Sequence, residues 1–209
     1  MRTPDGRDVE PLENVLSAGT VLHRVHQTQF EPTGFNPGTS PDSERTRFAF
    51  FGDPPVPVLY AADTPMAAVF ESILHDVPTR GGIVSEKKTR TQVLSAVQTT
   101  RDHRLLVLLG EGFRRVGEDA ERITRTPASQ YHQTVHWAEA AYDAGFDGMV
   151  WMSRKYDTDR AYVFFSRPDR EDGFETHPDP DLARPFAYDT HLDWLTLELA
   201  RLGVDIVQP

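Results

Sequence analysis

A glutamate lies in the middle of an otherwise apolar helical segment, and it is the residue best placed to do chemistry in this sequence. The apolar residues around it recur at the spacing of one buried helical stripe. The stripe comprises Met66, Val69, Phe70, Ile73, Leu74 and Val77. Burying a lone carboxylate is costly unless it is paired. Glu71 is therefore expected to have either a buried partner or a catalytic role.

Four further residues sit where a strand or an aromatic segment can present a polar group. Arg24 lies inside an apolar strand segment, Arg47 is flanked by two phenylalanines, Tyr60 ends a strand, and Ser153 follows the apolar run GMVWM. Each has an ordinary structural explanation: a solvent-facing strand charge, an edge residue, a strand tyrosine and a turn-capping serine. An arginine among aromatic residues also suits stacking or phosphate binding.

Together these five residues suit an anionic substrate with a cationic leaving group. Arginines can hold a pyrophosphate, a tyrosine can stack on a planar ring, and a carboxylate can stabilise the oxocarbenium ion that forms when a glycosidic bond breaks. No general base for Ser153 is identifiable in the sequence, so we interpret it as a hydrogen-bond donor to the substrate.

Other common site motifs are absent from the sequence. There is no GxGxxG after a strand, no GxxxxGK[ST] and no HExxH. His132 and His136 have the i, i+4 spacing that can hold a metal on a helix, but no third ligand follows from spacing. We therefore favour solvent-facing or hydrogen-bonded histidines and expect no metal.

Composition limits the class of protein. The 209 residues, 38% of them hydrophobic, suggest one domain with or without extensions. The lack of cysteine removes disulfides and thiol chemistry and fits a reducing compartment. No apolar run is long enough for a signal peptide or a membrane span, so we expect a cytoplasmic protein. A net charge of −10 disfavours direct nucleic-acid binding.

The elements that position these residues are short strands with a few separated helices. Strands are expected at 21–26, 56–62, 91–100, 104–109, 148–152 and 161–166, with 47–51 either a strand or a buried loop. Helices are expected at 64–77, 117–126, 130–144 and 189–202, with loops at 31–46 and 167–186 and a polar leader at 1–18. This pattern predicts an α+β fold rather than a doubly wound sheet.

Four segments resemble the RES-domain family, the toxins of a class of bacterial toxin–antitoxin modules. They are LHRV at 22–25, RF at 47–48, LYAADTPMAAVFE at 59–71 and HWAEAAYDAGFDGMVWMSR at 136–154. The resemblance divides the chain into a leader (1–18), a RES-like catalytic domain (19–168) and an extension with an amphipathic helix (169–209). It implies mixed, largely antiparallel sheets with flanking helices, similar to ADP-ribosyltransferases.

The resemblance also implies an activity, namely cleavage of NAD⁺ at the nicotinamide N-glycosidic bond. The Arg, Glu and Ser that name the family fall on Arg24, Glu71 and Ser153, and Arg47 and Tyr60 fall on further pocket positions. By this resemblance the arginines engage the phosphates, the tyrosine contacts the nicotinamide side and the glutamate supports bond cleavage. Ser153 joins the catalytic and the substrate-binding set. NAD⁺ is then a substrate rather than a prosthetic group, and ADP-ribose passes to inorganic phosphate or to water.

Partner antitoxins in the family carry a helical DNA-binding domain and an element that plugs the pocket. Two alternatives stay open: ADP-ribosyl transfer to a protein, and a non-catalytic RES-like binding module. The loop 31–46 and the tail 169–209 are longer than a minimal RES domain needs. We expect the tail helix to dock on the domain, with a homodimer contact or partner binding as the alternatives.

Overall fold

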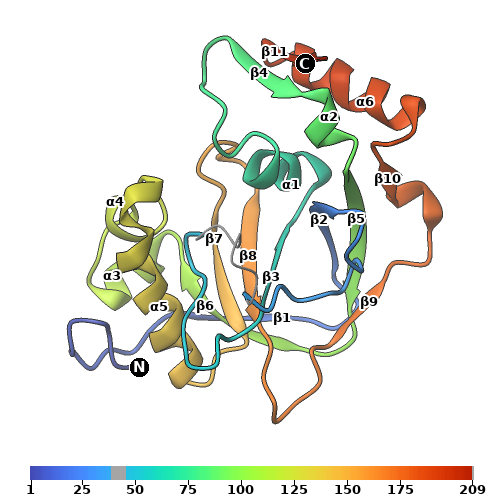
Figure 1. The fold of residues 1–209 in the computed structure, drawn as a ribbon. Coiled ribbons are helices and arrows are strands. Elements are labelled where there is room, and N and C mark those ends of the chain that lie inside the picture. The colour runs from blue at the N-terminus through green and yellow to red at the C-terminus, as the bar shows by residue number, and fades with distance from the viewer. Residues whose placement is uncertain (39–45, 209) are drawn as a thin grey trace.

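One large mixed sheet runs through the computed structural model, which describes residues 1–38 and 46–208 (Figure 1). Its strands lie in the order β1-β6-β7-β8-β3-β2-β5-β10, and β9 also pairs with β5. The strands are β1 Glu13–Leu16, β2 Val21–Gln27, β3 Val58–Ala62, β5 Gln92–Thr99, β6 His103–Leu108, β7 Gly148–Met152, β8 Arg160–Phe165, β9 Phe174–Thr176 and β10 Arg184–Pro185. Within this sheet only β6 and β7 pair in parallel.

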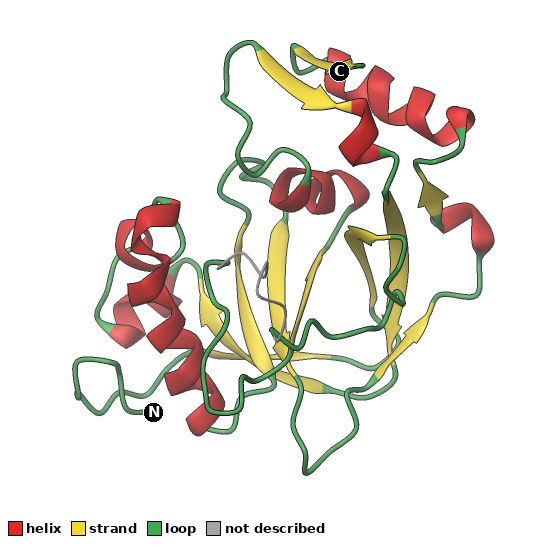
Figure 2. Cartoon of the chain, in the orientation of Figure 1, coloured by secondary structure: helices red, strands yellow, loops and turns green. Residues whose placement is uncertain are grey.

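Helices gather in two groups around the sheet (Figures 1 and 2). One group comprises α3 Glu111–Val116, α4 Ala120–Ile123 and α5 Tyr131–Asp143. The other comprises α1 Pro65–Ser72, α2 Glu86–Thr89 and α6 Asp189–Ala200, beside a small parallel sheet of β4 Gly82–Ser85 and β11 Val204–Val207. Single 3₁₀ turns occur at Ala128–Gln130 and Pro180–Leu182. The expected α+β class, with a mostly antiparallel sheet and flanking helices, is confirmed.

Alternation along β3 shows how the sheet separates two layers of core. Leu59 and Ala61 pack in one cluster, whereas Val58 and Tyr60 contact the cluster under α5. Successive side chains of a strand point to opposite faces, so β3 serves both layers. The neighbouring β7 is buried almost throughout, and a Cβ added at Gly148 would lie 2.1 Å from the carbonyl oxygen of Val163. Glycine is therefore required at that position.

The structure differs from the expectations mainly at short or exposed elements. Residues 13–16, placed in the leader by their lack of pattern, form edge strand β1 against β6. Segment 47–51 is the buried loop rather than the strand, with a single bridge from Thr46 to Ala49. The helix expected at 64–77 ends at Ser72 and continues as turns. Of the expected loop 31–46, residues 39–45 lie outside the described part of the chain.

The C-terminal segment packs against α1. Its buried side chains join one cluster with those of α1 and β5. This cluster includes Ala67, Ala68, Val69, Leu94, Phe186, Leu192, Leu195, Leu199 and Val204. The tail thus docks on the domain and covers the helix that carries Glu71. None of the helices in the described residues is long and apolar enough to cross a membrane.

Candidate active site

Glu71 and Ser153 meet although they are far apart in the sequence. Ser153 follows β7, is fully buried, and donates its hydroxyl proton to Oε1 of Glu71 at 2.6 Å. A hydroxyl–carboxylate bond of this length is typical of an ionised acceptor. The bond supplies the partner that a half-buried carboxylate requires and fixes its orientation. It also directs the Ser153 proton to Glu71, and a role for Ser153 as a hydrogen-bond donor to the substrate stays a prediction.

Hydrogen bonds between the start of α1 and the β7–β8 turn bring Glu71 and Ser153 into contact. Thr64 caps α1 by accepting the N–H of Ala67 at 3.2 Å, and it donates to Oδ2 of Asp159 at 2.8 Å. The carbonyl oxygen of Asp159 accepts the N–H of Ser153 at 3.0 Å. Side-chain oxygens at an N-cap satisfy free N–H groups of the first turn. One threonine therefore starts the helix of Glu71 and anchors the segment of Ser153.

The turn after Ser153 also contacts the segment that follows the C-terminal end of α1. Lys155 Nζ donates to the carbonyl oxygens of Leu74 at 2.8 Å and Val77 at 2.7 Å, and Tyr156 packs on Phe70 with ring centroids 4.9 Å apart. Carbonyl groups beyond a helix end have no intrahelical partner, so a lysine satisfies them well.

Arg47 is buried close enough to Glu71 for the two charges to interact. Its Nη1 donates to Oγ1 of Thr126 at 2.7 Å and to the carbonyl oxygen of that residue at 2.9 Å. Its Nη2 donates to the hydroxyl of Tyr131 at 3.3 Å, and the guanidinium lies 4.9 Å from the ring centroid. Burial lowers the pKa of Arg47, and the charge of Glu71 opposes that change. Arg47 therefore shares the electrostatic environment of Glu71.

Tyr60 holds the segment that carries Arg47. Its hydroxyl oxygen accepts the N–H of Phe48 at 3.1 Å and lies 2.8 Å from Oγ1 of Thr46. Its ring stands edge-on to Trp151, with centroids 6.3 Å apart. Burial raises the pKa of Tyr60, which keeps the phenol neutral. A nicotinamide contact for Tyr60 stays a prediction.

Arg24 occupies a separate position. Its Nη1 donates to the carbonyl oxygens of Pro32 at 2.8 Å and Gly34 at 2.9 Å, and burial lowers its pKa to about 10. Nε is buried without a hydrogen-bond partner among residues 1–38 and 46–208. Its neighbour Val25 packs in the cluster of α1, so alternation places Arg24 on the other face of β2. The structure thus gathers four of the five predicted site residues and leaves Arg24 at a loop.

Several residues at the site were not anticipated from the sequence. The hydroxyl of Tyr131 lies 3.0 Å from Nε2 of His75, and Arg154 Nη1 donates to the Thr126 carbonyl oxygen at 3.2 Å. Neither periodicity nor a motif marks these residues. They follow only from the packing of α5 and the β7–β8 turn around α1.

The two histidines considered as metal ligands lie on the exposed side of α5. His132 contacts the carbonyl oxygen of Ser129 at 3.1 Å, and His136 contacts Glu139 at 3.3 Å. Within the described residues no cluster of three or more His, Cys, Asp or Glu is arranged to hold a metal ion.

Comparisons with known proteins identify a family and show a distant structural likeness. Residues 21–189 match the RES domain family. The fold is similar to a chain in the crystal structure of the M. tuberculosis MbcT–MbcA toxin–antitoxin complex, with 17% sequence identity and a TM-score of 0.49. That match covers 78% of this chain and 86% of the other. No curated protein matches the sequence.

Proposed function

Because the chain belongs to the RES domain family, we propose that it cleaves the nicotinamide N-glycosidic bond of NAD⁺ and passes ADP-ribose to phosphate or water. The observation that carries this proposal is the 2.6 Å bond between Ser153 and the Glu71 carboxylate, whose charge acts on the buried guanidinium of Arg47. It places a fixed negative charge beside a positive one in a protein whose net charge is −10.

The chemistry of NAD⁺ suits this arrangement. Nicotinamide is cationic while it is bonded to the ribose and leaves as a neutral ring, so bond cleavage requires little acid catalysis. The enzyme must instead stabilise the ribosyl group, which develops positive charge in the transition state. A preorganised carboxylate aimed at that charge lowers the barrier, and Ser153 keeps the Glu71 carboxylate in place. Arg47 is the guanidinium that shares the environment of Glu71 and would attract an anionic group of the substrate, whereas Arg24 donates to the carbonyl oxygens of its own loop.

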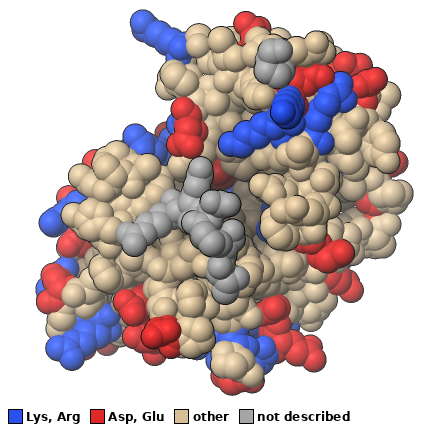
Figure 3. Space-filling view, viewed as in Figure 1, with Lys and Arg blue, Asp and Glu red and all other residues tan. Residues whose placement is uncertain are grey.

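We propose further that the protein is the toxin of a toxin–antitoxin module, whose partner is an antitoxin with a helical DNA-binding domain. Family membership supports this role. Acidic and basic side chains are interspersed over the face shown in Figure 3. The chain as a whole carries a net charge of −10, which is compatible with a basic partner.

Product analysis with a matched pair of variants tests the activity. Purified protein is incubated with NAD⁺, with and without inorganic phosphate, and nicotinamide and ADP-ribose products are separated by chromatography. Glu71→Gln keeps the size of the side chain and removes its charge, so nicotinamide release should fall about 10²–10³-fold. Glu121→Gln is the control, because that carboxylate is exposed and, among the described residues, forms an ion pair with Arg125 alone, at 3.6 Å.

Each result assigns the protein to a class. Nicotinamide release that needs phosphate identifies a phosphorylase, and release without phosphate identifies a glycohydrolase. Label from NAD⁺ that stays on a protein band identifies a protein ADP-ribosyltransferase instead. Folded protein that releases no nicotinamide contradicts the proposal, as does a Glu71→Gln variant with unchanged turnover.

A further inference from the structure

A chain of hydrogen bonds leads from Arg47 to the protein surface. Arg47 Nη2 is 3.3 Å from the Tyr131 hydroxyl, which is 3.0 Å from His75 Nε2, and His75 Nδ1 is 2.9 Å from Oδ1 of Asp76. Exposure rises along the chain: Tyr131 is buried, the His75 side chain is 34% exposed and that of Asp76 is 84% exposed. The chain therefore connects the site with solvent.

The direction of these bonds follows from the donors and acceptors available. A guanidinium only donates, so Tyr131 accepts from Arg47. A neutral imidazole donates from one nitrogen and accepts at the other. Nδ1 faces a carboxylate, which only accepts, so Nδ1 carries the proton and Nε2 accepts. The Tyr131 proton consequently points to His75.

Tyr131 belongs to the electrostatic environment of the site. Burial raises its pKa, and the charges of Arg47, Asp76, Glu71 and Arg154 all act on it. A neutral phenol whose proton points to a basic nitrogen can act as a relay. Its oxygen accepts a new proton while the phenol proton moves to that nitrogen. The Glu71 carboxylate already accepts the Ser153 proton, and the proposed function assigns it to the positive charge of the ribosyl group, so we look elsewhere for the group that takes the acceptor proton.

We propose that Tyr131 and His75 form a proton relay that accepts the proton of a water acceptor, with Asp76 orienting the imidazole. The proposal rests on the proposed NAD⁺ cleavage. Tyr131 would touch the acceptor, and His75 would act through it.

The step balances as follows. The bond between C1′ of the ribose and the nicotinamide nitrogen breaks, and its electron pair leaves with neutral nicotinamide. A lone pair of the water oxygen forms the new C1′–O bond. The water proton passes to the Tyr131 oxygen as the tyrosine proton passes to Nε2 of His75, and the resulting imidazolium, beside Asp76, releases a proton to solvent.

This relay predicts a dependence on the acceptor. Water must lose a proton when it adds, whereas the phosphate dianion and azide attack without losing one. General base assistance is worth about 10²–10⁴-fold where it operates. Loss of the relay should therefore slow hydrolysis and leave reaction with the two anions nearly intact.

The test compares three acceptors in three variants at about pH 8, where phosphate is mainly the dianion. His75→Gln keeps an acceptor for the Tyr131 hydroxyl but cannot take up a proton, and Tyr131→Phe removes the hydroxyl. His132→Gln is the control histidine, since it is exposed and contacts only the Ser129 carbonyl oxygen. Thermal unfolding of each variant confirms that it is folded. The wild-type protein and each variant are incubated with NAD⁺ in water alone, with phosphate and with azide, and products are separated by chromatography.

Support for the relay is a fall in hydrolysis of about 10-fold or more in His75→Gln and Tyr131→Phe, with azide or phosphate products within about 3-fold of wild type. An equal fall with all acceptors contradicts it, because the two residues would then only hold Arg47. Unchanged hydrolysis in His75→Gln also contradicts it, as does a wild type that uses phosphate but not water. A wild type that releases no nicotinamide with any acceptor removes the proposed function and the relay with it.

Discussion

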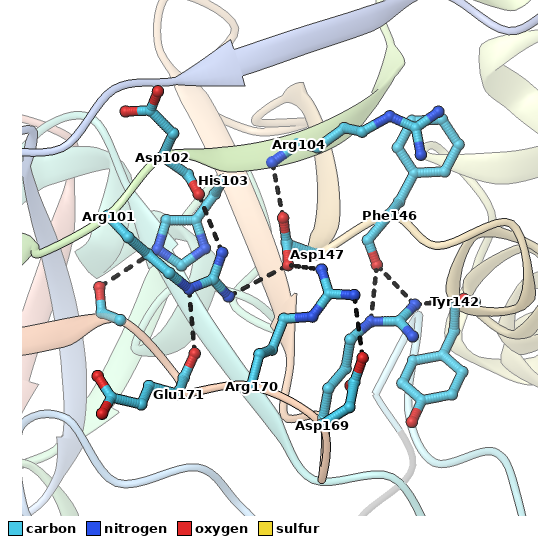
Figure 4. Close-up of polar contacts among 12 residues, drawn as sticks. Arg101, Asp102, His103, Arg104, Tyr142, Phe146, Asp147, Asp169, Arg170 and Glu171 are labelled. Atoms are coloured by element: carbon cyan, nitrogen blue, oxygen red, sulfur yellow. Dashed lines mark hydrogen bonds and ion pairs between the residues drawn. The ribbon is translucent and has the colours of Figure 1, made fainter.

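Replacing Asp147 should destabilise the fold more than any other single carboxylate change at the sheet. Asp147 precedes β7 and its side chain is 5% exposed; Figure 4 shows its polar contacts. Oδ2 accepts the backbone N–H of Arg104 at 2.8 Å, while Oδ1 accepts Nη2 of Arg101 at 3.1 Å and Nη1 of Arg170 at 3.0 Å. One carboxylate thus joins β6, the turn before it and the segment after β8.

The magnitude follows from what Asp147→Ala would leave behind. Removing one partner of a buried ion pair costs about 3–5 kcal/mol because the other charge stays unpaired. The side chains of Arg101 and Arg170 are 28% and 36% exposed, so water compensates in part and we expect about 3 kcal/mol. For a chain of this size that loss lowers Tm by about 6–12 °C.

Urea unfolding at neutral pH and thermal unfolding would measure the change. Asp147→Asn, which keeps an acceptor but loses the charge, should fall between wild type and Asp147→Ala. Asp169→Ala is the control, because this exposed residue pairs with Arg170 at 3.3 Å from the solvent side. A loss below about 0.5 kcal/mol in Asp147→Ala, the range of ordinary surface changes, would refute the reasoning.

The same carboxylate predicts a pH dependence with a definite sign. Burial alone would raise the pKa of Asp147, but the Arg104 N–H and the guanidinium groups of Arg101 and Arg170 outweigh it, and the pKa lies below its usual value. Such a group stabilises the fold fully above its unfolded pKa of about 3.9, and that contribution is lost as pH falls through the folded value. Wild type should therefore lose more unfolding free energy than Asp147→Asn between neutral and strongly acidic pH.

Two further substitutions test the docking of the tail and the support of the Arg47 segment. Leu195→Ala removes a fully buried side chain of α6 and should lower the free energy of unfolding in urea by about 2–5 kcal/mol. Leu197 is exposed, so Leu197→Ala should change that free energy little. Equal effects of the two substitutions would mean that the tail does not dock in solution. Tyr60→Phe leaves the Phe48 N–H without its acceptor and should cost about 1–3 kcal/mol, whereas the exposed Tyr188→Phe should be neutral.

The sequence predicted elements well where a buried element contains a continuous run of apolar residues. GMVWM and AYVFFS lie in the middle of the sheet, buried on both faces, so their runs read directly as strands. β1 lies at the sheet edge with two of its four side chains exposed, so ENVL shows no such run. β10 and β11 have two and four residues, too few for alternation to be recognised, and each is fixed by its pairing partner instead.

Helix α1 shows the limit of periodicity. Apolar residues continue at helical spacing through Val77, yet the helix ends at Ser72. The Ser72 hydroxyl donates to the Ala68 carbonyl oxygen, and the chain turns so that the Leu74 N–H reaches the Val69 carbonyl oxygen. Side-chain to backbone bonds of serine compete with helical bonds, and the turn after them is held by Lys155, which is distant in sequence.

The site residues fall into two groups: those that a sequence pattern indicates and those that only tertiary contacts bring to the site. Glu71 was visible because a carboxylate in an apolar stripe demands an explanation, and Ser153 because it ends a buried strand. Tyr131 and His75 carry no such signal, since a tyrosine that begins a helix and a histidine after one are both ordinary. Their bond joins residues 56 apart, and it forms because α5 packs beside the turn that follows α1. A relay of the proposed kind must connect the site with solvent, and that connection comes from the packing of two elements rather than from either segment.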